Sequence, residues 1–508
     1  MDKTIPIPSR VSIGIVEVKP QIIKLMIPSL SIRDIAHHFS NRDHFVFLDS
    51  RMTGSRSSGY SFIAFDPFMI FTSMDESVTL QIGAPGKRET FLYNTGEVFD
   101  ILDALLHRYN ISMNITDSFS PFVGGGIGYL GYEMGRLNET LPKTARHKIQ
   151  IPHSYIAFYN GVIIFDHQTE KLFYSYFDPS PFSHPINPSN SIHLDNHFLE
   201  PKNIEKEING IPPNLYDNMP ISEGWKNRDN KNPLAHFDSD FDASYHKQAI
   251  NRIKQYILAG DVYQVNMTGR FETSMNEIDS WELYRRLMDI NPAPFGAYLN
   301  FDGVKILSSS PERFLKIKET YIETRPIKGT VKRGATPEED EENRLFLVND
   351  EKNRAELAMI VDLMRNDIGK VCKAGTVKVN GFPELETYPS LHHLVSTITG
   401  ELLQGKNVID VLKGAFPGGS ITGAPKIRAM EIIDELEPVE RGVYTGAIGY
   451  LGFNGCSDLN IAIRTITVSQ NKAHIQAGGG IVADSVDSSE YDEMILKARK
   501  LFDAFLKN

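Results

Sequence analysis

The chain has 508 residues, of which 41% are apolar and 23% are charged, and its formal net charge is −11. This composition is that of a soluble globular protein with ample core. The negative charge argues against nucleic acid or an anionic membrane as the main partner, although a local site could still bind a small anion. Two cysteines, Cys372 and Cys456, exclude a disulfide framework and a cysteine-rich zinc site, which fits a reducing cytoplasm.

The sequence shows no membrane or export segment. The N-terminus has no apolar core of the kind a signal peptide needs, and no stretch of about 18 apolar residues follows it. We therefore expect a cytoplasmic protein with no membrane partner and no nucleic-acid partner.

The N-terminal region, 21–177, alternates short apolar runs with turns. Residues 99–109 have the apolar spacing of a helix. From 178 to 236 the chain becomes rich in Pro, Asn, Ser and His, which predicts a partly disordered linker or insertion. Three apolar runs of the N-terminal region predict strands: 44–50, 60–67 and 155–167.

The C-terminal region, 237–508, mixes helices and strands without regular alternation. Because many of its strand pairs look like hairpins, we predict an α+β fold rather than a doubly wound sheet. Helical spacing occurs at 244–261, 281–290, 352–369 and 488–507, and strand-like runs occur at 446–453, 459–468 and 472–482.

Gly126, Gly128 and Gly131 have the spacing of a dinucleotide-binding fingerprint. The run before them is a poor strand, no long helix follows, and the expected acidic residue is missing from its place. We interpret these glycines as tight backbone packing within a sheet.

Two sets of glutamates suit a hard cation. Glu356 begins a very apolar helix, and Glu490 and Glu493 share one face of the last helix because they are three residues apart. Mg²⁺ is commonly held by one or two carboxylates, with waters and an anionic substrate completing its shell. For each glutamate taken alone, a solvated surface acid is the simpler interpretation.

Other groups in this region could bind an anion rather than a cation. The glycine loop 477–482 can bring the N–H groups of Gly478, Gly479 and Gly480 close to an oxyanion. The loop 418–426 leads into a helix whose N-terminus could bind an anion. Arg464 lies in the strand-like run 459–468 and needs a carboxylate partner, either from the protein or from a ligand.

Three further residues have two interpretations each. Lys328, in TRPIKGT, is either a solvated cation in a turn or a nucleophile aimed by the proline and glycine around it. Glu312, in SSSPERF, is either an acid/base carboxylate at a strand end or a turn residue. His393 begins an apolar run, where a structural histidine is the commoner case. Neither cysteine has the setting of a glutamine amidotransferase nucleophile, so glutamine nitrogen would have to come from another polypeptide.

The motifs in 244–507 together resemble the chorismate-binding enzymes, which include anthranilate, aminodeoxychorismate, isochorismate and salicylate synthases. The first 175 residues match this family more loosely. The resemblance implies two large, mainly antiparallel sheets packed into a core with helices outside. It rests on GDVYQVNMT, SSSPERF, TRPIKGT, KNRAELAMIVDLMRNDIG, HHLVS, FPGGSITGAPKIRAMEIIDELE, RGVYTGAIGY, QAGGGIVADS and SSEYDE.

Two positions indicate the branch of the family. Gln264 stands where the water-adding members carry a lysine, which favours an ammonia-using enzyme. Lys328 stands where anthranilate synthases usually have alanine, and it resembles the covalent lysine of aminodeoxychorismate synthase. The implied activity is conversion of chorismate and ammonia to 4-amino-4-deoxychorismate, for 4-aminobenzoate and folate synthesis. Anthranilate synthase component I, of tryptophan synthesis, is the alternative.

The resemblance also implies roles for individual residues and a partner, a separate glutamine amidotransferase subunit. Lys328, Glu312 and His393 would be catalytic, and Glu356 and Glu493, assisted by Glu490, would hold Mg²⁺. Chorismate would be bound by Ser420, Thr422, Tyr444, Arg464, Gly478, Gly479, Gly480, Lys497 and Gln264. A tryptophan pocket, with a role that is regulatory, structural or lost, would include Ser50, Ser57, Ser58, Gly59, Tyr60, Pro294, Phe295 and Gly296.

Overall fold

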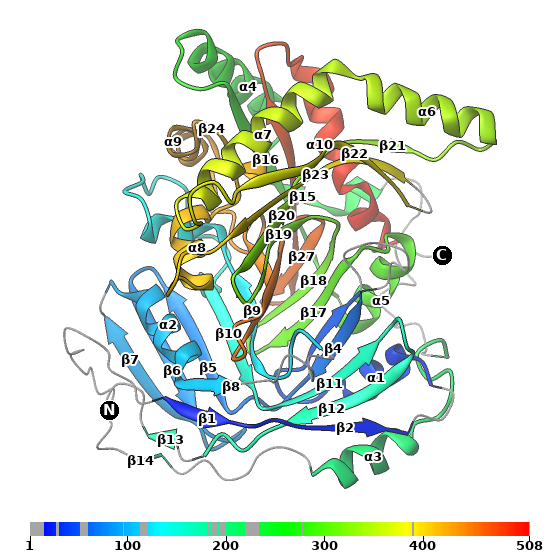
Figure 1. Cartoon of the computed structure of the whole chain (residues 1–508). Coiled ribbons are helices and arrows are strands. Elements are labelled where there is room, and N and C mark those ends of the chain that lie inside the picture. Colours follow the sequence, from blue (N-terminus) through cyan, green and yellow to red (C-terminus); the bar gives the residue numbers. More distant parts are fainter. Residues whose placement is uncertain are drawn as a thin grey trace.

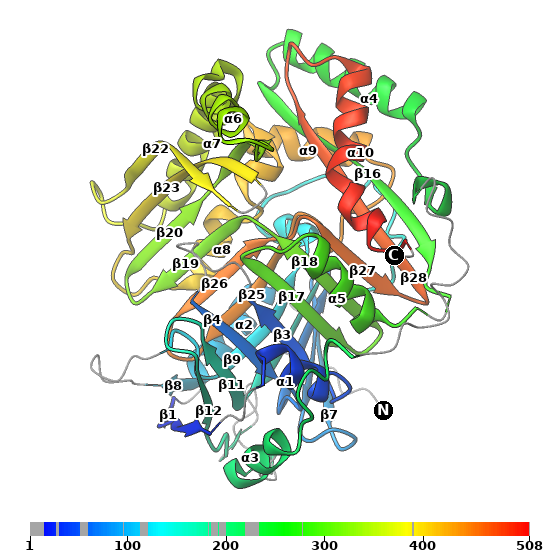
Figure 2. The ribbon, with the colours of Figure 1, turned by 90° about the vertical axis from the view of Figure 1, so that its right-hand side faces the viewer.

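Two large antiparallel sheets form the body of the protein, as the family resemblance implies (Figures 1 and 2). Every strand pair within these two sheets is antiparallel, and both sheets combine strands from the N-terminal and C-terminal regions. The computed structural model describes residues 15–26, 30–50, 59–94, 96–111, 120–180, 182–183, 191–192, 200–218, 233–276, 278–388 and 391–506.

The first sheet contains β5 (Met69–Met74), β6 (Ser77–Ile82), β7 (Glu89–Asn94), β9 (Gly125–Leu130), β10 (Ser154–Tyr159), β19 (Arg313–Lys318), β20 (Tyr321–Arg325), β21 (Ile327–Lys332), β22 (Lys378–Thr387), β23 (Leu391–Glu401), β25 (Ala447–Gly452) and β26 (Ser457–Ile461). Their order is β21-β23-β20-β19-β26-β25-β9-β10-β5-β6-β7, and β22 also pairs with β23.

The second sheet contains β2 (Gln21–Leu25), β3 (Val46–Asp49), β4 (Tyr60–Ala64), β11 (Gly161–Asp166), β12 (Lys171–Tyr176), β15 (Asp238–Ser239), β16 (Gln264–Ser274), β17 (Phe295–Phe301), β18 (Val304–Ser310), β24 (Gly423–Ala424), β27 (Thr465–Ser469) and β28 (Lys472–Ile481). Their order is β15-β16-β28-β27-β18-β17-β3-β4-β11-β12-β2, and β24 also pairs with β16. Two small pairs are separate: β1 (Val16–Val18) with β8 (Tyr109–Ile111), and β13 (Phe182–Ser183) with β14 (Ser191–Ile192).

Helices lie outside the sheets (Figures 1 and 2). They are α1 (Ile32–Phe39), α2 (Val98–Arg108), α3 (Pro201–Asn209), α4 (Ala243–Leu258), α5 (Ser280–Ile290), α6 (Pro337–Asn349), α7 (Glu351–Gly369), α8 (Val408–Ala415), α9 (Lys426–Leu436) and α10 (Asp487–Asp503), with short 3₁₀ turns η2 (Tyr132–Leu137), η4 (Pro233–His236) and η5 (Gly419–Ile421). The helices predicted from apolar spacing correspond to α2, α4, α5, α7 and α10. No helix in the described part of the chain is long and apolar enough to cross a membrane.

Helices α7 and α10 matter most for the site, because α7 packs on β23 and α10 packs on β28. The side chain of Asp350 caps α7 by accepting the N–H of Lys352. Leu357, Ile360 and Met364 recur at helical spacing along α7 and are buried. This apolar stripe holds the helix against the sheet and fixes its glutamate, Glu356, over the site.

Aromatic side chains join the two sheets across the core. Tyr155 of β10 stacks on Phe301 of β17 with ring centroids 4.4 Å apart. Phe62 of β4 meets Tyr450 of β25 edge-on at 5.5 Å. Each such pair adds about 0.5–1.5 kcal/mol to the burial of the rings themselves. These contacts fix the spacing between the sheets.

The glycines with dinucleotide-like spacing pack in the sheet, as we interpreted them. Gly126 and Gly128 lie in β9, between β10 and β25. A side chain on Gly128 would overlap the backbone of Tyr155. The spacing therefore reflects close strand packing.

Part of the predicted linker is folded onto the body of the protein. Ile204 and Ile208 of α3 are buried. The N–H of Tyr216 donates to Asp34 of α1 at 2.9 Å, and the guanidinium of Arg285 on α5 lies 5.5 Å from the Tyr216 ring. Residues 200–218 thus pack against α1 and α5, and much of the remaining linker lies outside the described residues.

Three local predictions are wrong. The run 155–167 is not one strand, because β10 and β11 belong to different sheets and the chain crosses between them at Asn160. The run 459–468 divides in the same way into β26 and β27. The interpretation of 477–482 as a glycine loop is also wrong, whereas the strand-like run predicted at 472–482 is confirmed, since Gly478, Gly479 and Gly480 lie in β28 and pair with β16.

Candidate active site

Glu312 and Arg464 lie where two neighbouring strand pairs cross between the sheets. β18 leads through Glu312 into β19, and β26 leads through Arg464 into β27. The two crossings are joined because the N–H of Ile461 donates to the Glu312 carbonyl at 3.0 Å. The prediction that Arg464 lies within a strand is therefore wrong. Its φ of 51° is unusual for a residue with a side chain and stores strain, as functional sites often do.

The Arg464 backbone is held by its neighbours. Its carbonyl accepts the Ser309 N–H at 3.1 Å and the Ser309 hydroxyl at 3.2 Å. The guanidinium contacts the side-chain oxygen of Asn291 at 3.5 Å and forms no ion pair with any described residue. The sequence predicts a carboxylate partner for this arginine, from the protein or from a ligand. Since no described carboxylate pairs with it, a ligand carboxylate is the partner that we expect.

Glu312 has the properties of an acid/base group. It is 5% exposed. Burial raises the pKa of its carboxyl to about 7, against smaller opposing effects of the Ser420 hydroxyl and the Lys328 ammonium. Its Oε1 has no hydrogen-bond partner of good geometry in the described part of the chain. A carboxyl that is part protonated near neutral pH can both donate and accept a proton.

Lys328 lies in a strand rather than in an exposed turn. It pairs with Leu394 of β23, and the register shifts between Lys328 and Thr330, which indicates a bulge. Gly329 makes this bulge possible because its φ is +74°, a conformation that glycine adopts at low cost. The bulge re-aims the lysine side chain into the space between β21 and α7.

Glu356 receives that lysine. The Nζ of Lys328 and the Nε2 of Gln264 each lie 2.8 Å from the same oxygen, Oε1 of Glu356. Burial alone would raise the pKa of this carboxyl, but Lys328 and Gln264 outweigh burial and hold the pKa below its usual value. Three predicted site residues from β21, α7 and β16 therefore meet at one ionised carboxylate.

The glycines of β28 bring α10 beside this group. A Cβ on Gly480 would overlap Nε2 of Gln264 and lie 3.1 Å from Oε1 of Glu356. A Cβ on Gly479 would lie 3.4 Å from Nζ of Lys497, 3.5 Å from Oε2 of Glu490 and 3.6 Å from Oε1 of Glu493. Because Gly479 and Gly480 have no side chains, the amine and carboxylate groups of these neighbours can lie close to the strand.

The three predicted metal glutamates thus flank two adjacent residues of one strand. Their carboxylate oxygens do not form a set within 4.8 Å of one another, which among the described residues is found only for His147, His153 and Glu440. Carboxylate oxygens around an open glycine strand suit a hard cation that completes its shell with water and ligand oxygens.

The two hydroxyls predicted to bind substrate differ in the structure. The Ser420 hydroxyl is buried and has no hydrogen-bond partner of good geometry among the described residues, but it lies near enough to Glu312 to lower the pKa of that carboxyl. The Thr422 hydroxyl instead contacts the Gly418 carbonyl at 3.2 Å, within its own loop. Ser420 therefore presents its hydroxyl beside Glu312, and Thr422 stabilises the loop.

Sequence reasoning missed the buried arginine beneath this loop. Arg441 pairs with Glu437 at 2.7 Å, and its guanidinium lies 4.6 Å from the ring of Tyr132. It also donates to the carbonyls of Ile421 and Asn266 at 2.9 and 2.8 Å. The only signal in the sequence was the spacing of Glu437 and Arg441, which are four residues apart just after a helix, as in a local ion pair.

His393 and Tyr444 are both buried. Nδ1 of His393 lies 2.7 Å from the hydroxyl of Thr330, two residues after Lys328. Burial, helped by the charge of Arg464, lowers the pKa of His393 to about 4, so its ring is neutral at pH 7. Burial raises the pKa of Tyr444, which lies near Arg441 and Glu437.

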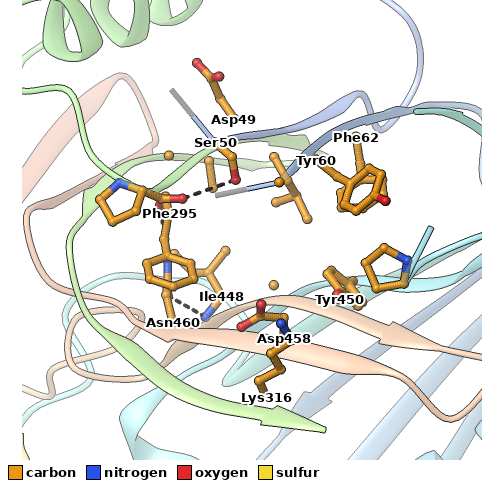
Figure 3. A pocket seen from close by; sticks show the side chains of 17 residues that line it. Asp49, Ser50, Tyr60, Phe62, Phe295, Lys316, Ile448, Tyr450, Asp458 and Asn460 are labelled. Atoms are coloured by element: carbon orange, nitrogen blue, oxygen red, sulfur yellow. Dashed lines mark hydrogen bonds between the residues drawn. The ribbon is translucent and has the colours of Figure 1, made fainter. Parts of the chain in front are cut away.

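The predicted tryptophan pocket forms a cavity of about 200 Å³ between the sheets (Figure 3). The Ser50 hydroxyl contacts the Pro294 carbonyl at 3.3 Å on its wall. Arg313, the residue after Glu312, lies 5.1 Å from the Phe295 ring and pairs with Asp458 at 2.9 Å. Of the predicted residues, Ser50, Gly59, Tyr60, Pro294, Phe295 and Gly296 line the cavity, whereas Ser57 and Ser58 lie outside the described residues.

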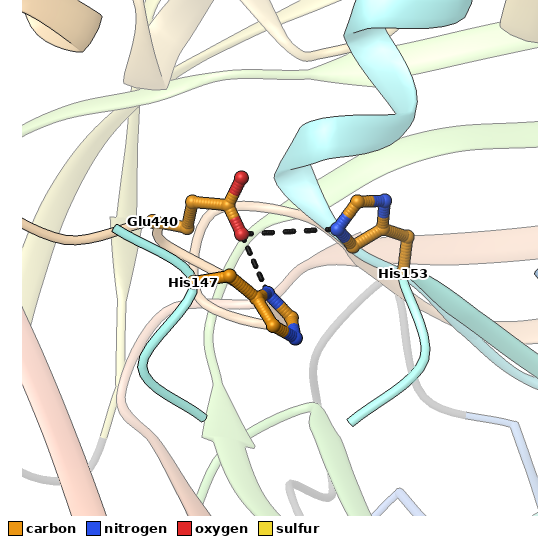
Figure 4. Close-up of side chains that lie close together, drawn as sticks. All are labelled: His147, His153 and Glu440. Atoms are coloured by element: carbon orange, nitrogen blue, oxygen red, sulfur yellow. Dashed lines mark hydrogen bonds and ion pairs between the residues drawn. The ribbon is translucent and has the colours of Figure 1, made fainter. Parts of the chain in front are cut away.

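His147, His153 and Glu440 form a separate cluster that the sequence did not indicate (Figure 4). Oε2 of Glu440 lies 2.6 Å from Nδ1 of His147 and 3.8 Å from Nε2 of His153, and Arg136 pairs with Oε1. Nδ1 of His153 accepts the N–H of Asp75 at 3.2 Å, so the His153 proton lies on the nitrogen that faces Glu440. The cluster is a hydrogen-bonded link between the segment before β10 and the segment after α9.

Comparisons with known proteins agree with the motifs. The family profile described as chorismate binding enzyme matches residues 62–503. Aminodeoxychorismate synthase component 1 of Escherichia coli (strain K12) is 36% identical over 467 residues, covering 91% of this chain and 94% of that protein. Anthranilate synthase component 1 of Acetivibrio thermocellus is 37% identical over 461 residues, covering 90% of this chain and 89% of that protein.

The fold agrees as well. The crystal structure of anthranilate synthase component I from Streptococcus pneumoniae TIGR4 matches with a TM-score of 0.69 at 28% identity, covering 89% of this chain and 94% of that one. These matches span both the N-terminal and C-terminal regions. The chain belongs to the chorismate-binding enzyme family.

Proposed function

We propose that this chain is the chorismate-aminating component of an aminodeoxychorismate synthase. It converts chorismate and ammonia to 4-amino-4-deoxychorismate in the cytoplasm, for 4-aminobenzoate and folate synthesis. A separate glutamine amidotransferase subunit supplies the ammonia. The observation that carries the proposal is that the Lys328 amine lies inside the site, 2.8 Å from Glu356 and near enough to the buried Glu312 carboxyl to lower its pKa.

The first half of the reaction removes the C4 hydroxyl. Lys328, as a neutral amine, forms a bond to C2 of the ring, the ring double bonds shift, and the C4–O bond breaks. Hydroxide leaves poorly, so protonated Glu312 donates its proton and water departs. Neutral His393 can donate a hydrogen bond to the same oxygen. The result is a covalent lysine adduct of the ring.

The second half installs the amine. Ammonia forms a bond to C4, the double bonds shift back, and the C2–N bond to Lys328 breaks. The Glu312 carboxylate takes a proton from the added nitrogen and returns to its starting state. Two moderate barriers thereby replace one difficult displacement. Gln264 is neutral, so it offers no side-chain base to activate water in competition with ammonia.

The anionic groups of chorismate need positive partners. Glu356 and Glu493, with Glu490, would hold Mg²⁺, which when bound cancels the repulsion between these carboxylates and the ring carboxylate. Arg464, whose guanidinium pairs with no described carboxylate, suits the second carboxylate of the substrate. Ser420, Tyr444, Lys497 and the N–H groups of Gly478 and Gly480 complete this anion site, since Gly479 faces Met267 of β16 in the ladder.

Anthranilate synthase component I remains the second candidate. Relatives of 36% and 37% identity carry the two different names, so overall similarity does not separate the activities. Lys328 favours amination without loss of pyruvate, because a covalent lysine adduct at C2 lets ammonia add at C4, where the hydroxyl has left.

Mass spectrometry tests the proposal directly. The chain is mixed with chorismate and Mg²⁺ without ammonia, quenched in acid, and digested. We expect an adduct on the peptide that carries Lys328. Lys328→Ala should abolish it, and Lys472→Ala, which removes an exposed lysine paired with Glu272 far from the site, should not. Adding ammonium should give a product that becomes 4-aminobenzoate only after a lyase is added; immediate anthranilate fluorescence would establish the second candidate instead.

A further inference from the structure

Two of the three glutamates assigned to the cation, Glu356 and Glu493, are already paired with lysines. Nζ of Lys328 lies 2.8 Å from Oε1 of Glu356, and Nζ of Lys497 lies 2.7 Å from Oε1 of Glu493. These two lysines are also the groups assigned to covalent attack and to anion binding. Each pair therefore joins a metal ligand to a group that the reaction needs elsewhere.

We propose that Lys328 competes with the divalent cation for Glu356 and is released toward the substrate only when the cation takes that carboxylate. Lys497 would do the same, more weakly, at Glu493. The role given to the released Lys328 rests on the proposed function. The competition itself is a property of the two pairs and does not depend on which product the enzyme makes.

The hydrogen bonds of Glu356 support the competition. A carboxylate oxygen has about two lone-pair sites, and Oε1 of Glu356 already accepts from both Lys328 and Gln264. A cation at this oxygen must displace one donor. A cation at the other oxygen would leave an ammonium within roughly 5 Å of a double positive charge, which is also unfavourable.

Lys328 is the donor that can leave. Its amine is a charged group on a flexible four-carbon stem, whereas Gln264 is neutral, wholly buried and fixed at the start of β16. Glu312 is close enough for its pKa to be affected by Lys328. Once released from Glu356, the amine on its flexible stem would be free to turn toward the acid of the reaction.

The two pairs should differ in strength. The side chains of Lys328 and Glu356 are 15% and 22% exposed, whereas those of Lys497 and Glu493 are 46% and 49% exposed. Solvent screens the second pair more strongly, so it contributes less. The competition should therefore be measured mainly at Lys328.

Calorimetric titration with Mg²⁺, without chorismate or ammonia, tests this ordering. Compared with the parent chain, Lys328→Met should bind Mg²⁺ about 5- to 10-fold tighter, and Lys497→Met about twofold tighter at most. Lys472→Met removes one equal charge from an exposed lysine elsewhere, which pairs with Glu272, and should leave the affinity unchanged. Methionine keeps the length of the stem, and a thermal melt of each variant checks folding.

A second measurement follows the amine itself. Acetic anhydride in limiting amount acetylates accessible lysines, and peptide mass spectrometry reports each site. Saturating Mg²⁺ should raise acetylation of Lys328 in the parent chain several-fold and leave Lys472 unchanged. If Lys328→Met binds Mg²⁺ no tighter than Lys472→Met, or binds none, the competition is wrong. If Lys328 labelling does not respond to Mg²⁺, the release is wrong. A chain that makes anthranilate would leave both results interpretable.

Discussion

Glu312 and Arg464 lie on adjacent crossings of the chain between the two large sheets. The Glu312 carbonyl accepts the N–H of Ile461, and the Arg464 carbonyl accepts the N–H of Ser309. Each crossing is thus hydrogen-bonded to the other strand pair. Because the ends of paired strands are rigid, this arrangement holds an acid and a cation at fixed positions without a flexible loop. It also brings together residues that are 152 positions apart, from Glu312 to Arg464.

Glu312→Gln should reduce turnover and stabilise the protein at alkaline pH. Removing a general acid typically costs about 10²–10⁴ in rate. The folded pKa of about 7 lies above the usual 4.5, so stability present below pH 4.5 is lost as pH rises through 7. That loss is roughly 3 kcal/mol for a buried carboxyl, and glutamine avoids it. Melting temperatures of parent and variant at pH 5 and pH 8 measure the difference.

The parent enzyme should also lose activity as pH rises through about 7, because Glu312 must be protonated to donate. Glu341→Gln, which changes an exposed glutamate of α6, is the matched control and should behave as the parent. A Glu312→Gln variant that is less stable than the parent at pH 8 would contradict the raised pKa.

Two neighbouring glycines of β28 should respond differently to alanine. In Gly480→Ala the new Cβ would overlap the Gln264 amide, so this variant should lose activity. In Gly479→Ala the nearest atom is 3.4 Å away, an ordinary contact, so the fold should be retained. Circular dichroism and steady-state kinetics compare the two variants. Parent-level activity in Gly480→Ala would show that the Gln264–Glu356 contact is dispensable.

The helices could be predicted because their apolar spacing and caps are local. The stripe of Leu357, Ile360 and Met364 identifies α7 without any knowledge of its neighbours. The two strand runs at 155–167 and 459–468 could not be divided correctly. The strands before and after each crossing are both largely buried, so the run of apolar residues shows no break where the chain passes from one sheet to the other.

The candidate site was predicted from the family motifs rather than from spacing. Lys328, Glu356 and Gln264 do meet, but their contacts join residues 28 and 92 positions apart, which no local pattern encodes. Arg441 was missed for the same reason, since its partners come from three separate segments. The lysine–glutamate pairing of the metal ligands is likewise visible only in three dimensions.

Ser420 and Thr422 offer a second matched comparison. Ser420→Ala should raise KM for chorismate with little change in melting temperature, because its hydroxyl has no hydrogen bond of good geometry to any described residue. Thr422→Val should lower the melting temperature, because its buried hydroxyl contacts the Gly418 carbonyl. Kinetics and melting curves separate the effects. A Ser420→Ala variant with unchanged KM would remove Ser420 from the substrate site.

The cavity of Figure 3 should bind tryptophan, and calorimetry measures this directly. Ser50→Ala should weaken binding about 2- to 10-fold, the value of one hydrogen bond, because the Ser50 hydroxyl lies on the cavity wall. Ala297→Leu should abolish binding by filling part of the 200 Å³ space while leaving Lys328 and Glu312 in place. Because Arg313 contacts Phe295 and directly follows Glu312, a bound ligand that shifts Phe295 would also alter turnover. If denatured parent protein releases no tryptophan and the native chain gives no heat with it, the cavity has another role.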